Sequence, residues 1–239
     1  MTTSRGIFLS ARWQHLAMAS WIVDPALLRD VIPAGTELDT HEQQTYVSLV
    51  GFRFLDTRVL GWPIPGHRNF DEVNLRFYLR RKTATGWERG VSFIRELVPR
   101  RAIAWVARTW YNEPYQALPM TSTIETHAVT YGWRTSRWNR LRMVMHGDPF
   151  LPDPASRDGW IAEHYWGWTK QRDGSTIAYR VEHPPWRIRA ADAVSIDADL
   201  EEAYGSPWGQ VLTRTPDSAF VADGSAITVS RPVRVVEAR

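Results

Sequence analysis

Apolar and polar residues alternate along residues 73–79 and again along 91–98, with a short polar turn containing a glycine between them. A period of two is typical of β-strands whose two faces meet different surroundings. Pro99 ends the second segment, because proline has no N–H group to donate to a neighbouring strand. The pattern therefore predicts two strands joined by a turn, with Glu96 on the face opposite Phe93 if the alternation is strict.

A different spacing follows the second strand. Apolar residues recur at helical intervals along 102–111, which predicts a short amphipathic helix that Asn112 and Pro114 bring to an end. Arg100 and Arg101 are then expected at the corner between strand and helix. The start of a helix favours anions, and two guanidinium groups strengthen that preference.

The rest of the chain is rich in further strand patterns. We expect a central strand over 45–54, one strand over 122–133, hairpin arms over 160–169 and 175–182, a hairpin within 220–229 and a short helix over 198–204. Many short strands with few helices predict a mainly β fold with a minor α+β character. The expected architecture is an antiparallel sandwich or cone-like barrel with a few short peripheral helices, built as a single domain over residues 1–239.

The composition narrows the class of protein. The net charge is only +3, which is a weak indication of nucleic-acid binding. Cysteine is absent, so disulfides and thiolate chemistry are excluded. No apolar run is long enough to span a membrane, and the first residues lack the apolar core of a signal peptide. We expect a cytoplasmic protein with neither membrane nor nucleic acid among its partners.

Common catalytic and ligand-binding motifs are missing from the chain. There is no Gly–x–Ser–x–Gly, P-loop or dinucleotide fingerprint. His146 with Asp148, or His164 with His183, could be assembled into a metal site, but no zinc motif is present. We therefore expect no metal and no cofactor.

A basic, aromatic segment at residues 133–142 allows two interpretations. Its four arginines and two tryptophans are compatible with a phosphate or single-strand contact. They also fit the solvated end of a hairpin, which we favour because the net charge is low.

The central stretch resembles the acetoacetate decarboxylases. Residues 96–102 (ELVPRRA) resemble their Glu–x–x–x–Pro–Lys–Lys segment, allowing for spacing, and residues 69–73 (NFDEV) resemble the Tyr–Asn–Glu segment before it. The resemblance implies that Glu72 matches the substrate-orienting glutamate, Arg100 the Schiff-base lysine and Arg101 its neighbour. Arginine stays protonated and is a poor nucleophile. We therefore expect no Schiff-base decarboxylase activity.

A wider resemblance is to the YqjF-like bacterial family of unknown function, which belongs to the acetoacetate decarboxylase-like group. It is carried by residues 13–18 (WQHLAM), 21–25 (WIVDP), 32–35 (IPAG), 46–50 (YVSLV), 61–65 (GWPIP), 69–76 (NFDEVNLR), 114–115 (PY), 181–186 (VEHPPW) and 222–225 (ADGS). This resemblance implies an acetoacetate decarboxylase-like β domain more than it implies an activity. By analogy with that fold type, a homo-oligomer is also among the expected assemblies.

The candidate site combines charged residues with aromatic walls. Glu72 and Arg100 are the expected catalytic pair, and the expected binding residues are Arg76, Glu96, Arg101, Trp105, Tyr115 and His183. An alternative for the charged group is an ion-pair network at a sheet edge, because such networks outnumber active sites. An alternative for His183 is a structural role, since the prolines after it shape a rigid corner.

These residues predict a pocket for a small carboxylate or oxo compound, in which acid–base chemistry proceeds without covalent catalysis. A second hypothesis is a non-enzymatic sensor or binding module that keeps a vestigial pocket. A third is a structural protein whose cavity is filled by its own side chains.

Overall fold

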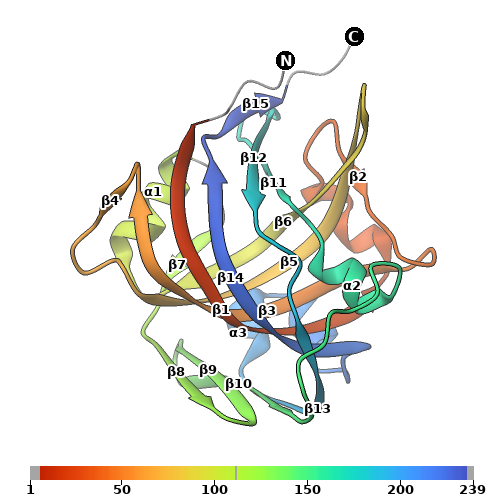
Figure 1. Cartoon of the computed structure of the whole chain (residues 1–239). Helices are drawn as coiled ribbons and strands as arrows, with labels where there is room; N and C mark the ends of the chain where they lie inside the picture. Colours follow the sequence, from red (N-terminus) through yellow and green to blue (C-terminus); the bar gives the residue numbers. More distant parts are fainter. Residues whose placement is uncertain (1–5, 111, 236–239) are drawn as a thin grey trace.

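The computed structural model describes residues 6–110 and 112–235, in which a large mixed sheet is surrounded by short helices (Figure 1). The strands are β1 (Ile7–Val23), β2 (Glu37–Leu38), β3 (Thr45–Val59), β4 (Trp62–Pro63), β5 (Phe70–Thr83), β6 (Gly86–Val98), β7 (Tyr115–Ala117), β8 (Met120–Glu125), β9 (Ala128–Arg134), β10 (Trp138–Met145), β11 (Trp166–Lys170), β12 (Thr176–Glu182), β13 (Ile188–Asp197), β14 (Ser218–Ser230) and β15 (Val233–Val235). The helices are the 3₁₀-helix η1 (Pro25–Val31), α1 (Arg101–Trp110), α2 (Arg157–Ala162), α3 (Leu200–Tyr204) and α4 (Trp208–Leu212).

Seven of these strands follow one another in the order β12-β11-β6-β5-β3-β1-β14. Their pairs are antiparallel except for β11 with β6, and β7 adds a second parallel pair at β6. β12 also pairs with β14, where Val181 lies opposite Val229, so the two ends of the series meet. The expected mainly β class is confirmed, although the sheet is mixed instead of purely antiparallel.

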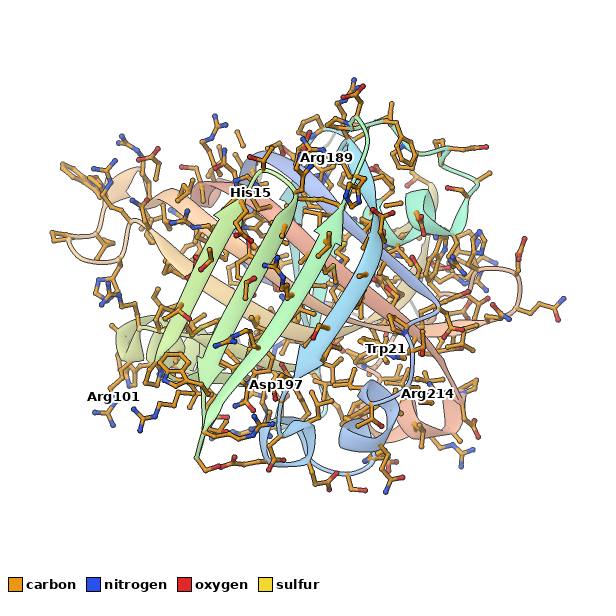
Figure 2. The ribbon with its side chains drawn as sticks, turned by 90° about the horizontal axis from the view of Figure 1, so that it is seen from below. His15, Trp21, Arg101, Arg189, Asp197 and Arg214 are labelled. Carbon is orange, nitrogen blue, oxygen red and sulfur yellow. The ribbon has the colours of Figure 1, made fainter. Side chains whose placement is uncertain are left out.

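A second layer covers one face of the long strands. Figure 2 shows β8, β9, β10 and β13 side by side, crossing the strands behind them. Tyr131 on β9 packs against Gly51 on β3, where a Cβ atom would lie 2.6 Å from the tyrosine ring. Leu49, Phe77 and Trp133 are fully buried in the apolar core between the layers. This face of the long strands is therefore filled, and only their other face is available for a cavity.

Several predicted elements are confirmed. The expected central strand is part of β3, which pairs with β1 on one side and β5 on the other. The predicted helices over 102–111 and 198–204 correspond to α1 and α3, although Tyr111 lies outside the described residues. No helix within 6–110 or 112–235 is long and apolar enough to cross a membrane.

Three predicted elements are wrong in part, two of them in the position of a turn and one in its type of secondary structure. The strand expected over 122–133 is the hairpin of β8 and β9, where Glu125 pairs with Ala128 across a turn. The apolar period continues through that short turn, so alternation alone could not locate it. The hairpin expected within 220–229 is the single strand β14, in which Gly224 lets the backbone approach Trp13 on β1. The arm expected over 160–169 begins with α2 and becomes a strand only at Trp166.

Candidate functional site

A cavity of about 430 Å³ lies on the inner face of the long strands. Strands β1, β3, β5, β6, β11 and β12 line it, together with the loop after β3 and the start of α1. Apolar and aromatic side chains form most of the wall. The polar groups come mainly from β5, from β6 and from the segment just before β7.

Strand β5 contributes three polar side chains at a spacing of two. Glu72, Asn74 and Arg76 all line the cavity, while Val73 and Leu75 between them are fully buried in the opposite core. The carboxyl group of Glu72 accepts hydrogen bonds from Asn74 Nδ2 at 2.9 Å and from the hydroxyl of Tyr115 at 3.1 Å. The alternation of this strand therefore places Glu72 and Arg76 in one cavity. Both residues are predicted from the sequence to belong to the candidate site.

Strand β6 departs from strict alternation through a β-bulge. Leu75 of β5 pairs with Arg95, but the next residue pairs with Phe93, so Ile94 has no partner opposite it. An extra residue in one strand reverses the order of its faces beyond that point. As a result Phe93 and Glu96 both line the cavity. The expectation that they lie on opposite faces is wrong for this reason.

Glu113 is a cavity residue that sequence reasoning missed. It accepts hydrogen bonds from the hydroxyls of Tyr179 at 2.5 Å and Thr169 at 3.3 Å. The chain after it pairs in parallel with β6, and Pro114 O accepts a hydrogen bond from the N–H of Glu96. Its only signal in the sequence is a charged residue between the end of a predicted helix and a proline. That signal is weak, because exposed turns carry the same pattern.

The three glutamates have unusual proton affinities. Burial raises the pKa of Glu72 to about 7, opposed by the hydrogen bonds from Asn74 and Tyr115. Burial likewise raises the pKa of Glu113 to about 7, opposed by Tyr179. Burial, with the neighbouring charges of Glu113 and Glu72, holds the pKa of Glu96 well above its ordinary range. Near neutral pH some of these three carboxyl groups are therefore protonated and others are ionised, as acid–base chemistry requires.

Arg76 is the arginine that faces these carboxyls. The residue is only 9% exposed, and it lies on the same face of β5 as Glu72. Its Nε atom has no hydrogen-bond partner among the described residues, and its Nη2 atom contacts Met18 Sδ at 3.7 Å. Within 6–110 and 112–235 it forms no ion pair, and the described lining includes no other arginine and no lysine.

A second polar group lies where His164 lines the cavity. Its Nε2–H donates to Asp39 Oδ2 at 3.2 Å, and Arg89 Nε donates to the same oxygen at 2.6 Å. Burial lowers the pKa of His164 to about 4, so the ring is neutral at neutral pH. Its Nδ1 atom is buried without a partner in the described part of the chain. The sequence offered His164 only as a metal candidate and gave no reason to join it to Asp39.

His183 also lines the cavity, as expected. Its ring stacks on Trp186 with centroids 3.9 Å apart, and Nδ1 lies 2.9 Å from Pro184 O. Burial lowers the pKa of His183 to about 4, which keeps it neutral. Both suggested roles are therefore compatible with its position, since the residue is packed and still faces the cavity.

Three predicted site residues lie elsewhere. Arg100 and Arg101 are exposed, Trp105 is 62% exposed, and the cavity wall includes none of them. Figure 2 shows the Arg101 side chain at the edge of the molecule, directed outward. The strand ends at Val98, so the arginines fall beyond its last pleat. The structure therefore does not bring Arg100 to Glu72, and it is Arg76 that shares the cavity with this glutamate.

The remaining candidates are the metal pairs and the basic segment. No three His, Asp or Glu side chains in the described ranges converge as metal ligands. In the basic segment, Arg137 pairs with Asp197 at 2.9 Å and Arg142 with Glu125 at 2.8 Å, while Trp133 is fully buried. These contacts agree with a solvated hairpin end whose charges are partly neutralised.

The fold is similar to that of acetoacetate decarboxylase and of an acetoacetate decarboxylase-like enzyme. The acetoacetate decarboxylase of Legionella pneumophila subsp. pneumophila str. Philadelphia 1 matches with a TM-score of 0.70 and 13% identity, over 96% of this chain and 87% of that one. An acetoacetate decarboxylase-like enzyme from Sphingomonas wittichii RW1 matches with a TM-score of 0.62 and 13% identity, over 98% and 95%. The enduracididine biosynthesis enzyme MppR, solved with pyruvate, matches with a TM-score of 0.64 and 11% identity, over 98% and 91%.

Sequence comparison assigns the family. The model of the DUF2071 family, described as an uncharacterized conserved protein, matches residues 10–226, and the chain belongs to this family. The uncharacterized protein YqjF of Bacillus subtilis (strain 168) is 30% identical over 201 residues, which is 81% of this chain and 80% of that protein. The resemblance to YqjF-like proteins is therefore confirmed.

Proposed function

We propose that the protein binds a small carboxylate with an oxo group in this cavity, and that Arg76 holds the carboxylate. The observation that carries the proposal is the buried guanidinium of Arg76, whose Nε has no partner among the described residues. Burying a charge is costly unless it is paired. A ligand carboxylate would provide that pair, because guanidinium and carboxylate match in shape and charge.

The neighbouring glutamates are compatible with an anionic ligand. Burial raises the pKa of Glu72, Glu96 and Glu113, so part of this group is protonated at neutral pH. A neutral carboxyl does not repel a carboxylate and can donate a hydrogen bond to it. The enzyme MppR, whose fold is similar, forms a complex with pyruvate, which is a ligand of the same chemical class.

The proposed chemistry is reversible enolisation. Ionised Glu72 removes a proton from the carbon next to the ligand's carbonyl group, and the electron pair of that C–H bond moves to the carbonyl oxygen. The oxygen then takes a proton from a neutral carboxyl group, for which Glu96 is suited because burial and the neighbouring charges of Glu113 and Glu72 keep it protonated by raising its pKa well above the ordinary range. No covalent bond to the protein forms in this step, in keeping with a described wall that contains no lysine.

The test separates binding from catalysis. Melting temperatures are measured with pyruvate, 3-oxobutanoate and the neutral ketone butan-2-one on the native protein, on Arg76→Gln and on Arg80→Gln. Arg80 is a matched control on the same strand, since its side chain is 39% exposed and pairs with Glu37 outside the cavity. We expect both acids to raise the melting temperature of the native protein and of Arg80→Gln in a concentration-dependent way. Neither acid should raise the melting temperature of Arg76→Gln.

Equal stabilisation of Arg76→Gln, or no stabilisation by any acid, would overturn the binding proposal. Exchange of the ligand's α-protons in deuterated water, followed by NMR, then tests the chemistry. An enzyme accelerates exchange and loses this activity in Glu72→Gln. Binding without exchange would instead favour the sensor or binding module.

A further inference from the structure

Polar and apolar groups are separated along the length of the cavity. On β5 the cavity-facing residues run from Phe70 through Glu72 to Arg76, and the register places Phe54 of β3 opposite Phe70. At about 3.3 Å per residue, the backbone of Phe70 lies about 7 Å from that of Glu72 and about 20 Å from that of Arg76. The charged groups therefore occupy one part of the cavity, and an aromatic part begins about one pleat repeat beyond Glu72.

The aromatic part is a continuous cluster formed by three strands and the loop before β13. The rings of Phe54 and Phe70 stack with centroids 4.5 Å apart. Trp13 of β1 meets Phe54 at 5.6 Å and Trp186 at 6.2 Å. All four side chains line the same cavity as Glu72. Such a surface favours an apolar occupant over water, since burying apolar area is the main source of affinity in pockets of this kind.

The cavity reaches the surface next to an apolar rim. Leu60 and Ile64, which flank β4, line the cavity and are 49% and 41% exposed. β4 and its loop project from the side of the long strands (Figure 1). Among the described lining residues, these two are the most exposed large apolar side chains. A ligand that enters beside them would contact apolar side chains before it reaches the charged residues.

We propose that the ligand is an amphipathic monocarboxylate, with its carboxylate at Arg76 and an apolar tail along Phe70, Phe54 and Trp13 toward the rim at Leu60 and Ile64. This inference rests on the proposed function and specifies its substrate class. A short acid such as pyruvate would fill the charged part and leave the aromatic part to water. A dicarboxylate would bring a second charge either to the glutamates or to the aromatic cluster, and both are unfavourable.

The experiment measures dissociation constants by calorimetry for acetate, butanoate, octanoate, dodecanoate and hexadecanoate, each below its micelle concentration. We expect binding to tighten about fourfold for each added methylene group until the tail passes the rim. The corresponding methyl esters should bind more weakly than the acids, and this difference should be absent in Arg76→Gln. Affinity that does not change with chain length would overturn the inference, even if short oxo acids bind.

Two exposed-site variants locate the tail without disturbing the core. Leu60→Ser changes the rim, and Leu151→Ser is the matched control, since Leu151 is 59% exposed and is not part of the described cavity wall. Leu60→Ser should weaken hexadecanoate severalfold and leave butanoate unchanged, while Leu151→Ser should change neither. Equal effects of both variants on hexadecanoate would contradict the proposed path of the tail. If the native protein bound the acids and their methyl esters equally, while affinity still rose with chain length, the role of Arg76 would be overturned. The proposed site for the tail would still be supported.

Discussion

The hydroxyl of Tyr115 donates a hydrogen bond of 3.1 Å to Oε2 of Glu72. This bond joins the segment after α1 to β5, two parts of the cavity wall that are distant in sequence. Because a hydroxyl donor stabilises the ionised carboxylate, it lowers the pKa of Glu72 against the larger effect of burial, which raises it. The Tyr115 hydroxyl therefore helps to set the pH at which Glu72 can act as a base.

Replacing Tyr115 by Phe should move that pH upward. Without the hydrogen bond the pKa of Glu72 rises further, so the midpoint of α-proton exchange against pH should shift up by about one unit or less. The free energy of unfolding should fall by only about 1 kcal/mol. Tyr204→Phe is the control, because the Tyr204 hydroxyl has no partner among the described residues and lies outside the cavity wall. A lower or unchanged midpoint in Tyr115→Phe would contradict the assignment.

Glu113→Gln should change the pH dependence of stability. The folded-state pKa of Glu113, about 7, lies above its ordinary value of 4.5, so the native state holds this proton more tightly and loses stability as pH rises between these values. Glutamine keeps an oxygen for Tyr179 and does not ionise. Denaturation at several pH values should show that the free energy of unfolding of the variant rises relative to that of the native protein from pH 5 to pH 8, by at most about 3 kcal/mol. A constant difference over this range would count against the raised pKa.

Asp39→Asn should be strongly destabilising. Asp39 accepts hydrogen bonds from Arg89 and His164, and its side chain is 5% exposed. Removing the charge leaves Arg89 without its carboxylate, at a cost of about 2–4 kcal/mol in the free energy of unfolding. Asp197→Asn, in the exposed pair with Arg137, provides the comparison and should change stability little. Similar losses in both variants, measured by urea denaturation, would show that burial of the Asp39 group is not what matters.

Gly167→Ala should disturb the cavity through Tyr179. A Cβ atom at Gly167 would overlap the ring of Tyr179, whose hydroxyl donates to Glu113. We expect a loss of about 1–3 kcal/mol in stability, together with weaker ligand binding, because the ring must move away from Glu113. Gly6→Ala is the matched control, since its nearest neighbour would be Arg231 Nε at 3.7 Å. Unchanged stability and binding in Gly167→Ala would contradict this prediction, because the ring of Tyr179 would then make room for the methyl group at no cost.

Alternation in the sequence predicts much of the central sheet. Strand β5 follows from its period of two, and the same period places Glu72 and Arg76 on one face. Strict alternation misplaces Glu96, because Ile94 forms a bulge that no local residue type announces. A bulge is set by the pairing of two strands, and pairing is not visible in one segment of sequence.

The site is only partly predictable for a related reason. Glu72, Arg76, Glu96, Tyr115 and His183 are expected from the sequence and do line the cavity. Arg100 is expected from the match of a short motif, and such a match cannot say that the corner carries its side chain outward. Glu113 and the pair of Asp39 with His164 come together only through tertiary contacts between segments distant in the chain.

The unpaired Ile94 also limits how β6 can be exchanged between proteins. A graft that copies residues up to Phe93 from one parent and from Arg95 onward from another must keep Phe93 opposite Arg76 and Arg95 opposite Leu75, with or without an extra residue between them. Deleting Ile94 would remove the bulge and leave Glu96 opposite Asn74, on the face that lines the cavity. If Ile94 were instead kept and paired with Leu75 in a regular ladder, Glu96 would turn into the opposite core, and Leu97, now fully buried there, would face the carboxyls. For anyone building chimeras of this family, β6 segments should therefore be aligned by their pairing with β5, because a simple residue count along β6 does not tell which face a side chain takes.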